Sequence, residues 1–143
     1  MQIITGWLIL ILGGLLYLAQ IISSVNFALA QKLGIQERPE QTDRVLQTAE
    51  RYTAYWDLVT LGWLPLSGIL MIIDHDWWPI AALTGGAIYL DASGREAAKI
   101  FSLRKEGFRL GTKGQQRAFL ASYIVMALMG TALIAYSISK LAI

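Results

Sequence analysis

The sequence predicts an all-α integral membrane protein with four transmembrane helices in an up-down bundle. Hydrophobic residues make up 55% of the 143 residues and charged residues only 15%. The apolar runs are also too long for helices of a soluble core. A chain of this length has room for about four spans of roughly 20 residues each. These observations predict a single four-helix transmembrane domain.

The four apolar runs place the spans at about residues 3–29, 54–73, 77–100 and 118–141. The first run is long enough to cross the bilayer with some tilt. Pro65 lies in the middle of the second run, where proline removes a backbone donor and leaves the carbonyl oxygen of Leu61 without its usual partner. We therefore expect the second span to be kinked at Pro65.

The distribution of basic residues predicts the orientation. Of the twelve lysine and arginine residues, four lie between the first and second apolar runs and seven lie between Arg95, near the end of the third run, and Arg117, just before the fourth; only Lys140 lies elsewhere. Cytoplasmic loops of membrane proteins carry an excess of lysine and arginine. Both termini and the short 74–76 connection are therefore expected outside, and both basic loops in the cytoplasm. This is the arrangement of a multi-pass protein of a bacterial cytoplasmic membrane.

Two carboxylates are predicted inside the membrane near its cytoplasmic face. At a rise of about 1.5 Å per residue, Asp91 lies about 9 Å and Asp57 about 5 Å inside that boundary. Polar residues on the helical stripes of the four spans gather in the same half, whereas the outer half is rich in alanine and glycine. We expect a tightly packed outer half and a polar cluster that opens toward the cytoplasm. The candidate binding residues are Gln20, Asp57, Asp91, Arg95 and Tyr123.

Asp91 has two interpretations. In the structural one it pairs with Arg95 one turn later, and both side chains extend toward the basic surface. In the functional one Asp57, Asp91 and Arg95 share a site for an ion, a proton or a lipid headgroup, because ionisable groups inside a bilayer are costly and tend to be kept for a use.

Several kinds of chemistry are not expected. The chain has no cysteine and a single histidine, His75, which lies in the outer connection. A cysteine-ligated cluster, a bis-histidine haem and a histidine-rich metal centre are therefore excluded. We predict no cofactor, no metal and no catalytic residue. Nucleic acid is not an expected partner, since topology accounts for the basic residues.

In length, in number of predicted spans and in the residues Arg44, Glu50 and Arg51 near the start of the second span, the chain resembles small four-span glutathione-transferase-like membrane enzymes. The asparagine that this family has between such residues is absent here. No site residue is carried over from the resemblance.

Three functions from different classes remain open. The first is a small membrane protein that binds or transports a small ion, proton or lipid through the inward polar cluster. Its expected partners are membrane lipids and either further copies of itself or a larger membrane complex. The second is an accessory or scaffold subunit of a larger membrane complex. The third is a membrane-embedded enzyme that acts on a lipophilic substrate.

Overall fold

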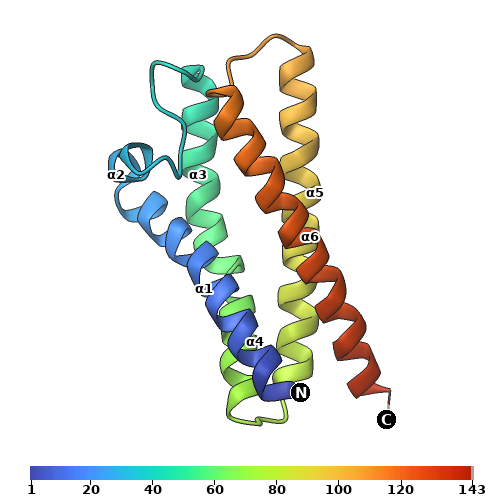
Figure 1. Cartoon of the computed structure of the whole chain (residues 1–143). Helices are drawn as coiled ribbons and strands as arrows, with labels where there is room; N and C mark the ends of the chain where they lie inside the picture. The colour runs from blue at the N-terminus through green and yellow to red at the C-terminus, as the bar shows by residue number, and fades with distance from the viewer. Residues whose placement is uncertain (143) are drawn as a thin grey trace.

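The structure is a computed structural model that describes residues 1–142, and over these residues it is helical without strands (Figure 1). Three segments are long and apolar enough to cross a membrane: Gln2–Val25, Arg44–Ile72 and Lys113–Leu141. The all-helical class is confirmed, and these segments are consistent with a membrane protein. The helices are α1 (Gln2–Val25), α2 (Phe27–Lys32), α3 (Arg44–Thr60), α4 (Trp63–Ile72), α5 (Trp78–Lys105) and α6 (Lys113–Leu141).

The predicted third span corresponds to α5, which is not among the three segments apolar enough to cross by length and composition. Its second half carries Asp91, Arg95, Glu96 and Lys99. These charges lower the mean hydropathy of the helix. A span through α5 therefore stays a prediction.

The helices run up and down, so the chain reverses direction at both ends of the molecule (Figure 1). The start of α1, the end of α6 and the 73–77 turn lie at one end, which we call the closed end. The 33–43 and 106–112 connections lie at the other, which we call the loop end. The main packing pairs are α1 with α4 and α3, α4 with α5, and α5 with α6. α3 and α5 are not among these pairs, and they separate toward the loop end, whereas α1, α4 and α5 pack closely toward the closed end. α1 and α6 are not a packing pair either, and an apolar opening lies between them.

Glycines let the helix backbones approach closely in the tight half. A Cβ atom on Gly68 of α4 would lie 2.7 Å from the backbone nitrogen of Leu10 in α1. A Cβ atom on Gly86 of α5 would lie 2.8 Å from the carbonyl oxygen of Gly130 in α6. Small residues permit such contacts between membrane helices. The expected close packing of the glycine-rich half is present.

The first helix ends earlier than the predicted limit of residue 29. Asn26 follows α1, and its side-chain oxygen accepts a hydrogen bond from the backbone N–H of Leu29 at 3.0 Å. Asparagine is among the best N-cap residues because its side chain satisfies a free donor at a helix start. The chain therefore ends α1 at Val25 and begins the short helix α2.

The helix through the second predicted span is interrupted at Leu61 and Gly62, just before Pro65. The carbonyl oxygen of Leu61 accepts a long 3.4 Å bond from the N–H of Leu64, one residue before the proline that has no N–H to offer. The hydroxyl group of Tyr17 in α1 donates a 2.8 Å hydrogen bond to the carbonyl oxygen of Leu58 beside the break. The kink itself stays a prediction.

The last two helices extend further than their predicted spans toward the loop end. α5 continues to Lys105, five residues beyond the predicted limit of residue 100. α6 begins at Lys113, before the predicted start at residue 118, because Thr112 and Gln115 form a capping box that satisfies the first backbone donors. Both extensions bring charged and polar turns to the loop end.

Candidate functional site

A cavity of about 280 Å³ lies at the loop end, where the helices separate. Its walls come from α1, α3, α5 and α6, and the two connections of the loop end cover it. On α3 the lining positions Glu50, Ala54 and Asp57 recur at helical spacing, and Leu61, directly after the helix, continues them, so one face of this helix borders the cavity. The polar lining residues are Gln20, Gln36, Glu37, Thr42, Glu50, Thr53, Asp57, Glu96, Lys99, Ser122 and Tyr123.

The cavity is acidic. Four carboxylates line it, from Glu37, Glu50, Asp57 and Glu96, and among the described lining residues Lys99 is the one cation. No ion pair involves Glu37 or Asp57 within residues 1–142. Carboxylates outnumber ammonium groups, so the interior has an excess of negative charge.

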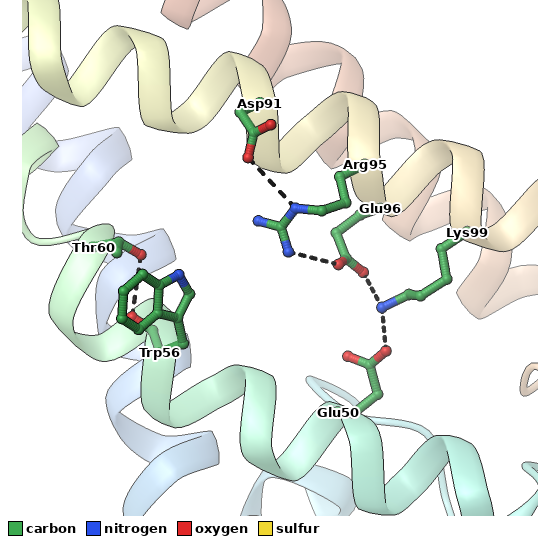
Figure 2. A network of polar contacts seen from close by, with 7 residues as sticks. All are labelled: Glu50, Trp56, Thr60, Asp91, Arg95, Glu96 and Lys99. Atoms are coloured by element: carbon green, nitrogen blue, oxygen red, sulfur yellow. Dashed lines mark hydrogen bonds and ion pairs between the residues drawn. The ribbon is translucent and has the colours of Figure 1, made fainter.

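Lys99 joins two helices across this cavity. Its ammonium group pairs with the carboxylate of Glu50 on α3 and with that of Glu96 on its own helix, α5 (Figure 2). Their side chains are only 23% and 15% exposed. An unpaired charge in such a position is costly, so the ammonium group stabilises both carboxylates. This contact also links α3 to α5 where their backbones have separated.

The ion-pair network continues outward from the cavity along α5. Arg95 lies 3.9 Å from Glu96 and 3.4 Å from Asp91, whose side chain is 72% exposed (Figure 2). The network therefore leads from Glu50 inside the cavity to Asp91 on the outer surface of the bundle. Asp91 balances the charge of Arg95, as the structural interpretation expects.

The two connections of the loop end form a roof over the cavity. Thr42 and Leu110 make an isolated antiparallel bridge, and the N–H of Gly111 donates to the carbonyl oxygen of Gln41 at 3.0 Å. Asp43 accepts from the backbone N–H of Arg109 at 2.9 Å and from its guanidinium at 3.2 Å. These contacts hold together loops that are far apart in the sequence.

One polar atom of the roof lacks a partner. The residue Thr42 is 3% exposed and lines the cavity, yet its Oγ1 has no hydrogen bond within the described residues. Most buried polar side-chain atoms are hydrogen-bonded. Thr42 therefore offers an unused donor and acceptor to whatever fills the cavity.

Two roof carboxylates have shifted pKa values. Burial raises the pKa of Glu37 above its ordinary value, outweighing the hydrogen bond from its own backbone N–H. The backbone N–H of Arg109, followed by its guanidinium, lowers the pKa of Asp43. Glu37 thus holds a proton more readily than a free glutamate, and Asp43 less readily than a free aspartate.

Of the five binding residues predicted from the sequence, three line the cavity and two do not. Gln20, Asp57 and Tyr123 line the cavity, each from a different helix. Asp91 and Arg95 do not line it; they pair with each other beside the cavity, on the side of α5 that faces α3, where both side chains are exposed (Figure 2). The expected direct contact between Asp57 and the Asp91–Arg95 pair is absent from the hydrogen bonds and ion pairs of the described residues.

Five further cavity residues are not among the site residues predicted from the sequence: Glu37, Thr42, Glu50, Glu96 and Lys99. Glu96 and Lys99 lie one turn apart on α5, and Ala92 and Leu103 continue their stripe. This spacing is a usable signal, but it competes with the Asp91–Arg95 stripe on the same helix. Glu37 and Thr42 lie in a connection, where no periodicity points to a site.

The helical fold, the apolar segments and the acidic cavity place the chain in a broad class: small helical proteins whose composition is consistent with membrane insertion. No protein-family model, curated protein or solved structure matches the chain.

The Asp43–Arg109 pair leads to a prediction about the roof. Changing Asp43 to asparagine should speed hydrogen exchange at the Gly111 amide, because the charge that holds Arg109 is lost. Since the pKa of Asp43 is lowered, its contribution is present above the ordinary aspartate value of about 3.9 and disappears as the pH falls through the lowered value. The difference between wild type and variant should therefore be full at pH 6 and vanish in strong acid.

Glu40→Gln is the matched control for this measurement. Glu40 contacts Arg109 only through its backbone carbonyl oxygen, so the roof should keep wild-type exchange. Equal exchange in wild type and Asp43→Asn at pH 6 would contradict a role for the ion pair in closing the roof.

Proposed function

We propose that this protein is a four-span membrane protein that binds a small cation, a proton or small ion, in a cavity facing the cytoplasm. The observation that carries the proposal is the lining, in which four carboxylates face a single ammonium group. A cation that enters such a space lowers the repulsion among the carboxylates. The same lining disfavours an anionic lipid headgroup.

The proposed orientation rests on the positions of the basic residues. The two connections of the loop end and the helix turns beside them hold most of the lysine and arginine residues, whereas the start of α1 and the end of α6 lie at the closed end (Figure 1). The positive-inside rule then places the loop end in the cytoplasm. The length of α5, 28 residues or about 42 Å, supports it as the third of four spans, with its charged half toward the cytoplasmic boundary.

The closed end supports binding rather than an open pore. Gly68 packs against α1, Gly85 against the backbone of Leu64, and Gly86 against Gly130. These contacts close the space between α1 and α4, between α4 and α5 and between α5 and α6 beyond the cavity, and the opening that remains between α1 and α6 is lined mostly by apolar side chains. Passage of a cation across the membrane would require α1, α4 and α5 to separate.

The test compares two aspartates on neighbouring helices. Asp57→Asn should weaken cation binding by at least about tenfold, equal to about 1.4 kcal/mol, because it removes a charge from the cavity and keeps the shape of the side chain. Asp91→Asn should leave affinity near wild type, since Asp91 does not line the cavity. Calorimetric titration of the purified chain in detergent with sodium, potassium and ammonium salts measures both, and pH-stat titration measures proton binding.

Equal losses in the two variants would contradict the proposed cavity, because Asp91 would then act as strongly as Asp57. Affinity for a cation should also fall as the pH is lowered. Protons compete for the same carboxylates, and the raised pKa of Glu37 makes this competition begin above the ordinary pKa of glutamate.

A further inference from the structure

We infer that the ligand of the cavity is a small organic ammonium ion, and that Lys99 occupies part of its site in the free protein. This inference rests on the proposed function and specifies the class of cation. Three features of the cavity carry it: the position of Lys99, the unpartnered hydroxyl group of Thr42, and the apolar remainder of the lining.

The position of Lys99 demonstrates ammonium recognition within the cavity. Glu50 and Glu96 approach its ammonium group from two different helices (Figure 2). Lysine has a flexible four-carbon stem, and this side chain is still 31% exposed. It can therefore turn outward and leave both carboxylates to another ammonium group.

Thr42 supplies a polar contact that Lys99 does not use. Its Oγ1 is buried in the roof, lines the cavity and has no partner in the described chain. Glu37, also in the roof, lines the same space without an ion pair. An ammonium ion with N–H donors satisfies a hydroxyl oxygen and carboxylates together, whereas a quaternary ammonium ion has no N–H to donate.

The remaining walls favour an organic body over a bare metal ion. Leu46, Ile100, Leu103, Phe119 and Met126 form much of the lining. Within residues 1–142 no group of three or more carboxylate, histidine or cysteine side chains has an arrangement that could hold a metal ion. At about 30 Å³ per water, the volume equals about nine water molecules. This suits a ligand of about ten non-hydrogen atoms or fewer.

The experiment titrates the full chain in a non-ionic detergent with n-butylammonium chloride by calorimetry. Tetramethylammonium, sodium and neutral n-butanol serve as comparison probes. Wild type should bind n-butylammonium at least about tenfold more tightly than each of the three. Butanol also measures any simple partition into the micelle, because it shares the alkyl chain and lacks the charge.

Two substitutions test the role of Lys99. Lys99→Met removes the competing ammonium group and should tighten n-butylammonium binding about tenfold. The double variant Lys99→Met/Glu96→Gln removes one positive and one negative charge, so the formal charge of the cavity stays unchanged while Glu50 is freed. It should also bind more tightly than wild type, and it guards against misfolding caused by two unpaired carboxylates. Lys105→Met, on an exposed turn of the same helix, is the control and should bind like wild type.

Thr42→Val tests the roof hydroxyl group, because valine keeps the shape and removes the oxygen. Binding of n-butylammonium should weaken severalfold, while Thr48→Val, at an exposed position of α3, should have no effect.

Three results would overturn the inference. They are sodium binding as tight as n-butylammonium, butanol binding as tight as n-butylammonium, and a double variant that binds no more tightly than wild type. If sodium or protons bind and n-butylammonium does not, the inference fails and the proposed function stands. If no cation binds at all, both fail.

Discussion

Replacing Gly130 with alanine is expected to lower the free energy of unfolding by about 1–3 kcal/mol, the usual cost of overpacking a tight core. The new Cβ atom would lie 2.6 Å from the carbonyl oxygen of Gly86 and 3.1 Å from the backbone nitrogen of Leu90. Both neighbours are backbone atoms of α5, so they cannot turn away as a flexible side chain would. The two helices must separate, and the contacts along their interface weaken.

Unfolding in mixed micelles with increasing denaturing detergent measures this effect. Gly94→Ala is the matched control on α5, because no heavy atom lies within 4 Å of its added Cβ. Alanine is favoured over glycine inside a helix by up to about 1 kcal/mol, so this control should be neutral or stabilising. If Gly130→Ala unfolded at the same detergent fraction as wild type, the close α5–α6 crossing would be refuted.

The second large effect concerns topology and should be all or none. A reporter that is active only in the cytoplasm should work when it is inserted in the 107–111 connection. The same reporter should be silent when it is inserted at His75 or fused after Lys140. The reason is the concentration of lysine and arginine at the loop end, which favours retention of that end in the cytoplasm.

A complementary reporter that is active only outside the cytoplasm provides the control and should give the opposite pattern at the same three positions. If both reporters instead placed His75 in the cytoplasm, the cavity would face the outside. The proposed orientation of the cavity toward the cytoplasm would then be wrong, although the cavity itself would be unaffected.

The helices were largely predictable because the signals that form them are local. Long apolar runs predict α1, the α3–α4 segment and α6, and all three appear as segments able to cross a membrane. The end of α1 was predicted too late, although Asn26 carries a cap signal in the sequence. Hydropathy alone does not reveal such a signal inside a nearly continuous apolar run.

Part of the cavity was predictable for a related reason. Gln20, Asp57 and Tyr123 are polar residues in apolar helices, and such residues tend to face the interior of a bundle. On α5 the same tendency does not show which face of the helix points to the bundle interior. The stripe of Asp91 and Arg95 and the stripe of Glu96 and Lys99 are both charged, and they are about a quarter turn apart around the helix.

The sequence by itself determined the helical class, the apolar segments and the asymmetric distribution of basic residues, because each depends on composition or on neighbours along the chain. Only the tertiary structure decided which charged face of α5 lines the cavity. The rotation of α5 is set by the close contacts of Gly85 and Gly86 with α4 and α6, and those contacts turn Glu96 and Lys99 inward. The tertiary structure also decided how the roof forms. Thr42 and Leu110 pair there across two loops that are distant in the sequence, and no periodic pattern encodes such a pairing.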